Sequence, residues 1–340
     1  MIRLLISLLA LSLASAFAPT VRTARTTSIS AVSRRDVLAS SAAATIPLLA
    51  NLPLAAWADE GIGTKDKPIV VLGSSGKTGK LIVNKLVALN LYTTAATRSG
   101  SSSFPSSPYL STAVCDVTSP TSLTDALKSA SACVFAASAS KKGGDAKAVD
   151  YKGVAYTAQA CVDNSVPKLV VVSSGAVTRP ESVGFKITNV FGRIMDYKIA
   201  GENELRNIYK SSKTAHYTIV RPGGLSEQPS TGAAGVEVSQ GDIFSAEIGR
   251  DDVANLVVAS LTVGAKSDDV TFECYGSGGE TMFGMKTGPA KLSKSLTSKD
   301  ELVHRSSDSF ASLVNNLLTD AELAKTGIVS DYKGTDIEPL

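Results

Sequence analysis

Between residues 67 and 275, short apolar runs rich in β-branched side chains alternate with longer stretches whose apolar residues recur at helical spacing. The run 169–172 (Leu-Val-Val-Val) is apolar at every position, which is typical of a strand covered on both faces. The pattern predicts strands over 68–72, 92–97, 111–117, 132–137, 168–173, 216–221 and 270–274, and helices over 78–90, 122–129, 146–164, 195–211 and 251–261.

Alternation of strands with helices predicts βαβ units, in which consecutive strands run parallel. We therefore expect an α/β fold, namely a Rossmann-type, doubly wound parallel sheet with helices on both faces. Residues 59–340 are expected to form this domain, with a C-terminal tail region from about residue 275. Within the tail, 277–299 is rich in Gly, Ser and Lys and is expected to be a loop, followed by helices over 307–318 and 320–325.

The first 58 residues have the composition of a targeting leader. Arg3, an apolar stretch over 4–13 and the small residues 14–16 are typical of a signal peptide, and residues 20–35 are rich in Ser, Thr and Arg without an acidic residue, as in a transit peptide. The Ala-Phe-Ala-Pro passage at 16–19 resembles the junction of bipartite plastid leaders in algae with complex plastids. We therefore expect a plastid (chloroplast) location.

A second apolar segment, residues 37–58, leaves two interpretations open. Arg34 and Arg35 precede it, it carries no charge, and it ends in Ala-Trp-Ala. These features resemble a twin-arginine signal for the thylakoid lumen that is cleaved after Ala58. Uncleaved, a segment of this length would instead associate the protein with a membrane as an anchor.

Charge and composition exclude several classes of partner. The chain holds 34 basic and 31 acidic residues, of which residues 1–58 contain five and one, leaving 29 and 30 in the remainder. A nearly neutral domain gives no electrostatic basis for binding nucleic acid. The four cysteines are far apart in apolar runs and there are only two histidines, so we expect buried thiols and no metal site.

A glycine-rich segment follows the first predicted strand directly and opens the first predicted helix. Glycines there permit a tight turn, and they let backbone N–H groups and the positive end of the helix dipole approach a pyrophosphate. The segment also resembles the end of a P-loop, but that motif needs glycine where Val71 stands. A turn without a ligand is the remaining alternative. The expected dinucleotide-binding residues are Gly73, Ser74, Ser75, Gly76, Lys77, Thr78 and Gly79.

The end of the second predicted strand favours NADP over NAD as the cofactor. NAD sites usually carry Asp or Glu there for the ribose hydroxyls, whereas this chain has Arg98 and no acidic residue between Leu91 and Ser103. A guanidinium binds phosphate through paired, charge-assisted hydrogen bonds. We therefore expect Arg98 to bind the 2′-phosphate of NADP with help from Lys77, the alternative being a solvated surface arginine.

These residues together resemble the atypical short-chain dehydrogenase/reductases, in particular the NmrA-like and plastid NAD(P)-binding members, over about residues 67–275. The glycine spacing, the segment 217–224 (Tyr-Thr-Ile-Val-Arg-Pro-Gly-Gly) and the segment 248–254 carry the resemblance. Lys198, Gly201, Glu202 and Leu205 are similar to the family's K-x-x-A-E-x-x-L helix. The cofactor residues that the resemblance implies are Asp116 and Val117 at the adenine, Ala136, Ala137 and Ser138 along the ribose, and Lys198 at the nicotinamide ribose.

One departure from the family concerns catalysis. Typical short-chain dehydrogenases use a Tyr-x-x-x-Lys pair, in which the lysine lowers the pKa of the tyrosine so that the phenol can transfer protons. Here Ile194 stands four residues before Lys198, and Tyr197 is adjacent to it, about 100° away on a helix. The candidate catalytic residues are therefore Lys198, which can bind the ribose, and Ser174, which can polarise a carbonyl; neither replaces the missing acid.

Two functions from different classes remain. The first is an NADP-dependent oxidoreductase acting on an unknown small-molecule substrate in the plastid. The second is a non-catalytic NADP-binding redox sensor or assembly scaffold for a photosynthetic complex. The missing tyrosine favours the second, and the glycine loop with Ser174 and Lys198 favours the first. A lumenal address conflicts with the first function, because NADPH is chiefly stromal; loss of cofactor binding is a third alternative.

Overall fold

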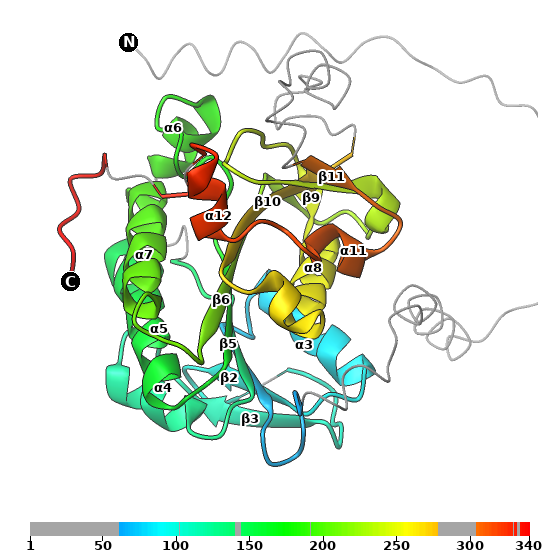
Figure 1. The fold of residues 1–340 in the computed structure, drawn as a ribbon. Helices are drawn as coiled ribbons and strands as arrows, with labels where there is room; N and C mark the ends of the chain where they lie inside the picture. Colours follow the sequence, from blue (N-terminus) through cyan, green and yellow to red (C-terminus); the bar gives the residue numbers. More distant parts are fainter. Residues whose placement is uncertain are drawn as a thin grey trace, which may run out of the picture. The chain divides into compact units, whose positions relative to one another are not determined.

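The computed structural model (Figure 1) describes residues 61–101, 103–139, 144–190, 192–277, 304–328, 330–331 and 334–340. The predicted leader over 1–58 and nearly all of the predicted loop over 277–299 lie outside these residues. In the described part of the chain, no helix combines the length and the apolar content that crossing a membrane requires.

Parallel strands make up most of the main sheet, whose described strands follow the order β11-β8-β10-β6-β5-β4-β1-β2-β3. The order reverses at β1, because β2 pairs with one of its edges and β4 with the other. In open α/β sheets, ligands bind beyond the carboxyl ends of the strands at such a switch point. The parallel strands are β1 (Ile69–Leu72), β2 (Thr93–Thr97), β3 (Leu110–Val114), β4 (Ala132–Phe135), β5 (Lys168–Val172), β6 (His216–Pro222) and β10 (Val270–Gly276).

Helices cover both faces of this sheet, as Figure 1 shows. Side chains alternate along a strand, so Val71 of β1 packs into one layer and Leu72 into the other. The first layer contains α3 (Lys77–Ala88), α8 (Arg250–Thr262) and α11 (Phe310–Val314). The second contains α4 (Pro120–Leu127), α5 (Val154–Asp163) and α7 (Ile194–Tyr209). The predicted Rossmann-type, doubly wound sheet is therefore confirmed.

The sheet has an edge that the hydrophobic pattern does not predict. β8 (Val236–Ser239) runs antiparallel to β10, and β11 (His304–Ser306) pairs with β8. β8 alternates apolar and polar residues, and its polar Glu237 is nevertheless buried. The chain beyond residue 275 thus contributes a strand to the main sheet.

Three helical segments differ from the predicted pattern. The helix expected over 146–164 begins as a π-helix, η1 (Lys147–Gly153), before it continues as α5. α6 (Val183–Asn189) lies where the sequence pattern predicts no element. α11 is shorter than the expected 307–318, because Asn315 is extended and Asn316 takes a φ of +56°. The shorter elements are β7 (Leu225–Ser226), β9 (Ile248–Gly249), η2 (Ala233–Gly235), η3 (Gly264–Ser267) and α12 (Asp320–Lys325), the last of which matches its predicted range.

Candidate functional site

The glycine loop between β1 and α3 is packed too closely to hold side chains at two of its positions. Gly73 has a φ of +73°, and a Cβ there would lie 2.6 Å from the backbone nitrogen of Ala137. A Cβ at Gly79 would lie 2.3 Å from the carbonyl oxygen of Gly73. The loop therefore lies directly against Ala136 and Ala137 at the end of β4, which brings these predicted cofactor residues together.

The start of α3 is open to an anion. Gly76 is the N-cap residue, no side chain caps the helix, and Lys77 and Thr78 form its first turn without an acidic residue. The first N–H groups of a helix have no partner within it, and the helix dipole is positive at this end. Ser74 has a different role: it is fully buried and donates its hydroxyl to the Ala96 carbonyl at 2.9 Å, which holds the loop to β2.

A cationic cavity of about 660 Å³ lies at the end of β2. Arg98 lines it, and so does Lys80 of α3, whereas Lys77 was the lysine predicted to assist Arg98. Both charged residues of the lining are cations, so the cavity suits a phosphate. The hydroxyl side chains of the lining add hydrogen-bonding groups and are Ser75, Thr97, Ser99, Ser101 and Ser103.

Lys77 is not part of the cavity lining and pairs instead with the carboxylate of Glu227. Its ammonium lies 2.7 Å from Oε1 of Glu227, and the guanidinium of Arg250 lies 2.6 Å from the same oxygen. Glu227 follows β7, and Arg250 begins α8. The hydrogen bond from Lys77, together with the charges of Arg250 and Lys77, lowers the pKa of Glu227. Lys77 and Glu227 are 71% and 60% exposed, so solvent screens this contact strongly.

The residues predicted to meet the adenine follow β3. Asp116 accepts hydrogen bonds from the backbone N–H and the hydroxyl of Thr118, at 2.9 and 2.8 Å. These bonds, and to a smaller degree the charge of Arg98, lower the pKa of Asp116. Val117 packs against η1, where its side chain lies 3.3 Å from the position of a Cβ on Gly153. Asp116 is thus an ionised turn residue near the cationic cavity.

Ser138 and Lys198, which belong to separate motifs, meet at one carboxylate. The hydroxyl of Ser138 donates to Oδ1 of Asp150 at 2.7 Å, and Nζ of Lys198 lies 2.8 Å from that oxygen. The backbone N–H of Ala139 donates to Oδ2 at 2.8 Å. Sequence reasoning missed Asp150, because it lies inside a predicted helix and its partners are distant along the chain.

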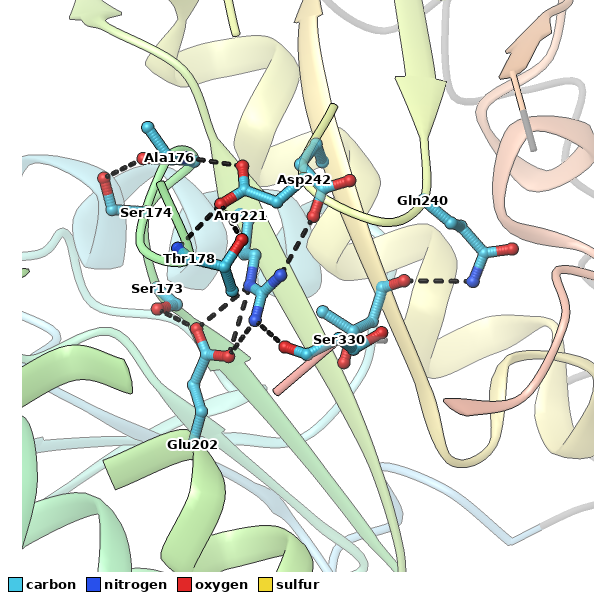
Figure 2. A network of polar contacts seen from close by, with 12 residues as sticks. Ser173, Ser174, Ala176, Thr178, Glu202, Arg221, Gln240, Asp242 and Ser330 are labelled. Carbon is cyan, nitrogen blue, oxygen red and sulfur yellow. Dashed lines mark hydrogen bonds and ion pairs between the residues drawn. The ribbon is translucent and has the colours of Figure 1, made fainter. Parts of the chain in front are cut away.

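Ser174 lies in the loop that follows β5, and its hydroxyl donates to the carbonyl of the next residue at 3.2 Å. Asp242 fixes this loop by accepting the N–H groups of Ala176 at 2.7 Å and Thr178 at 2.9 Å (Figure 2). The loop also donates a backbone hydrogen bond to the Pro222 carbonyl at 2.7 Å. Ser174 is thereby held beside the segment that leaves β6.

Glu202 and Arg221, which carry two of the family motifs, form a buried ion pair (Figure 2). Their side chains are 1% and 0% exposed, and NH2 of Arg221 lies 2.6 Å from Oε2 of Glu202. Arg206 contacts the same oxygen at 3.1 Å, and Ser173 donates its hydroxyl to Oε1. Burial alone would raise the pKa of Glu202, but the charges of Arg221 and Arg206 outweigh burial and lower it. These motif residues therefore form a charged network inside the core.

Arg221 also contacts a second carboxyl group, that of Glu273, whose pKa is shifted in the opposite direction to the pKa of Glu202. Glu273 of β10 lies 3.2 Å from NH1 of Arg221 and is buried. Burial, together with the charge of Asp242, raises the pKa of Glu273 to about 8 despite the attraction of Arg221. Glu273 is therefore mostly protonated at pH 7. Arg221 also donates to the carbonyl of Ser330, which ties the C-terminal tail to this network.

Ile194, at the position of the family's tyrosine, and Tyr197, beside Lys198, make contacts of other kinds. Ile194 packs beside the apolar cluster that contains Met195 and Ile199. The ring of Tyr197 lies under the guanidinium of Arg193, 6.0 Å from centroid to Cζ. The polar groups at this place are therefore the ammonium of Lys198, paired with Asp150, and the hydroxyl of Ser138.

A glycine loop at the switch point of a doubly wound sheet, an uncapped helix start and a cationic cavity at the end of β2 define a dinucleotide-binding Rossmann protein. The chain belongs to the NAD(P)H-binding family, whose model matches residues 73–263. This result confirms the resemblance to the atypical short-chain dehydrogenase/reductases and the expectation that the protein binds a nicotinamide dinucleotide.

The similarity to individual relatives covers far more of the chain than the glycine loop. An uncharacterized chloroplastic protein of Arabidopsis thaliana is 31% identical over 212 residues, which cover 58% of this chain and 72% of that protein. A relative from Saccharomyces cerevisiae is 30% identical over 202 residues, covering 57% and 86% of the two chains. Among solved structures, an oxidoreductase from Lactococcus lactis superposes with a TM-score of 0.52 at 21% identity, covering 67% of this chain and 95% of that one. This last likeness supports the fold.

Proposed function

We propose that the protein binds NADP(H) in the plastid, with the 2′-phosphate between Arg98 and Lys80. The observation that carries the proposal is the cationic cavity at the end of β2, whose two charged residues are these cations. The uncapped start of α3 would receive the pyrophosphate, and Lys198 would hold the nicotinamide ribose. The chloroplastic relative from Arabidopsis thaliana supports the plastid location.

Removing the guanidinium of Arg98 tests the cofactor assignment. A hydrogen bond to a charged group is worth about 1.5–3 kcal/mol, which corresponds to about a 10- to 100-fold change in affinity. We therefore expect Arg98→Ala to weaken NADPH binding by that factor in a calorimetric titration, and Lys80→Ala to weaken it less. NADH lacks the 2′-phosphate, so its affinity should change less than about two-fold. Lys213→Ala, which removes an exposed charge elsewhere, is the matched control. Equal weakening of NADPH and NADH would contradict the assignment.

For activity, we propose an NADP-dependent oxidoreductase that acts on a small plastid molecule. The bound nicotinamide would supply or accept the hydride. Ser174 lies in a loop that is fixed by Asp242 and joined to Pro222, which supports a role in polarising a substrate carbonyl. Lys198, paired with Asp150, would bind and orient the cofactor and would not supply the proton. The substrate would therefore have to receive its proton from another group or from water.

A non-catalytic NADP(H)-binding protein, serving as a redox sensor or as a scaffold in the assembly of a photosynthetic complex, is the second candidate function. The position of Ile194 favours it, since an apolar side chain occupies the place of the family's proton donor. Steady oxidation of NADPH with a panel of carbonyl compounds, lost in Lys198→Ala, supports the oxidoreductase. Tight binding of NADPH without turnover on that panel or in plastid extracts supports the sensor.

The location of the mature protein bears on the choice between these functions. A mature N-terminus at Asp59 would support cleavage of the twin-arginine-like segment and a lumenal address. Peptides that run through 37–58 would support the anchor instead. Mass spectrometry of the protein isolated from plastids distinguishes the two, and a lumenal protein would favour the non-catalytic function, because NADPH is chiefly stromal.

A further inference from the structure

Asp150 is a buried carboxylate that joins three parts of the fold. It lies in η1, it pairs with Lys198 of α7 at 2.8 Å, and it accepts the hydroxyl of Ser138 at 2.7 Å. Its other oxygen accepts the N–H of Ala139 at 2.8 Å. Both oxygens of Asp150 are therefore used, and the ammonium of Lys198, whose side chain is only 12% exposed, has its charge balanced inside the protein.

Gly201 permits the contact between η1 and α7. A Cβ at this position would lie 2.5 Å from the carbonyl oxygen of Asp150 and 3.2 Å from the Cβ of Val154. A backbone oxygen cannot move aside as the end of a flexible side chain can, so a larger residue would push α7 away from η1. The K-x-x-A-E motif has alanine at this position, whereas this chain has glycine, which the close contact of α7 with η1 requires.

The π-helical conformation of η1 is the second unusual feature of this contact. π-helical turns are rare and occur frequently at functional sites. The turn spans Lys147–Gly153 and includes Asp150, whose carboxylate contacts both the loop after β4 and α7. The π-turn and the close helix contact at Gly201 thus both lie beside the one ion pair of Asp150 with Lys198.

We propose that Asp150 is a positioning residue that fixes Lys198 and the Ser138 loop for the nicotinamide half of the dinucleotide, while the adenosine half binds independently of it. This inference rests on the proposed function. Lys198 and Ser138 are the residues assigned to the ribose at that half, and both contact Asp150. Arg98 and Lys80, which are assigned to the 2′-phosphate, lie on other elements.

Two ligands that share the adenosine half separate this role from a general effect on the fold. 2′,5′-ADP carries the adenosine and the 2′-phosphate but no nicotinamide ribose, so it probes only the Arg98 end of the cleft. We expect Asp150→Asn to weaken the binding of NADPH about 10-fold or more in calorimetric titrations of the purified protein. The reason is that Lys198 loses the carboxylate that fixes its position. The affinity for 2′,5′-ADP should change less than about two-fold.

Asp150→Asn leaves Lys198 buried without its charge partner, so two further variants guard against simple instability. Asp150→Asn/Lys198→Met removes both charges; we expect its Tm to return towards that of the wild type while NADPH binding stays weak. Gly201→Ala keeps both charges and displaces α7 from η1. We expect it to show the same selective loss of NADPH affinity.

Each outcome of this set decides the inference. The inference is supported if Asp150→Asn and Gly201→Ala both weaken the binding of NADPH but not that of 2′,5′-ADP. Equal weakening of both ligands, no change in either, or wild-type NADPH affinity in the double variant would show that Asp150 is only a structural partner of Lys198. A wild-type protein that binds neither ligand would instead refute the proposed function itself.

Discussion

The two ends of the proposed dinucleotide site use their cations in opposite ways. At the end of β2, Arg98 and Lys80 are exposed and line a cavity whose charged residues are all cationic. At the other end, Lys198 is paired with the buried Asp150, and Arg221 with the buried Glu202. Exposed cations that line a cavity attract an anionic ligand, whereas paired cations in the interior fix geometry. On the proposed function, the first end would provide affinity and the second would position groups.

This difference explains how binding and turnover can be separated within one family fold. On the proposed function, the glycine loop and the cationic cavity would hold the phosphates, and their residues lie on other elements than Lys198. An apolar Ile194 in place of the proton donor would then be compatible with binding at the adenosine end. Conversely, a variant that weakens the buried end should lower stability before it alters phosphate binding.

The largest expected effect is on stability, from removing the charge of Glu202 and with it the buried ion pairs to Arg221 and Arg206. Glu202→Gln leaves Arg221 and Arg206 without the carboxylate that both contact, and loss of one partner from a buried ion pair costs about 3–5 kcal/mol. Urea denaturation measures this loss. Glu204→Gln, on the same helix and partly exposed, should change the free energy of unfolding by less than about 0.5 kcal/mol. Similar values for the two variants would contradict a structural role for Glu202.

Glu273 should make the same end sensitive to pH. Its pKa is raised to about 8 in the folded protein by burial, so between its ordinary value and 8 the folded state holds a proton that the unfolded state releases. Its contribution to stability is thus fully present at acidic pH, below the ordinary pKa of a glutamate, and is lost as the pH rises through that window. The slope is at most about 1.4 kcal/mol per pH unit.

Glu273→Gln removes the titrating group and keeps its shape. The difference between the free energies of unfolding of wild type and variant, measured from pH 5 to 9, should shift against the wild type as the pH increases towards about 8. A difference that stays constant over this range would show that Glu273 does not titrate with a raised pKa.

The smallest expected effect is on NADPH affinity, from changing the exposed Glu227 that pairs with Lys77. Its carboxylate lies 2.7 Å from Lys77 of the glycine loop, where it competes with the phosphates of a ligand for that cation. Glu227→Gln should therefore strengthen NADPH binding by about two- to five-fold at low ionic strength, and salt should remove the gain. Weaker binding in the variant would indicate that Glu227 holds the loop in its binding conformation instead.

Local patterns were sufficient to predict the secondary structure that carries the glycine loop of the candidate site. The strand, glycine loop and helix from Ile69 to Ala88 follow one another without a break, so their spacing alone indicates the turn. Arg98 could be assigned in the same way, because it immediately follows β2. Lys80 was within reach of the same reasoning, since it lies one helical turn after Lys77.

Contacts between distant residues could not be predicted in this way. Asp150 lies in a helix-like stretch, and nothing near it in the sequence identifies Lys198 as its partner or η1 as π-helical. Glu202 and Arg221 could be recognised as family residues, but their pairing depends on how α7 packs against β6. The edge strand β8 was missed because its pairing with β10 and β11 joins residues that are distant along the chain.

The affinity ratio of the wild-type protein for NADPH and NADH tests the central claim most directly. On the proposed assignment, both ligands would extend from the glycine loop to Lys198, and they differ only in the phosphate assigned to Arg98 and Lys80. Calorimetric titration at one ionic strength should give a dissociation constant for NADPH at least about 10-fold below that for NADH. Equal affinities, or a preference for NADH, would contradict the assignment of the cationic cavity to the 2′-phosphate.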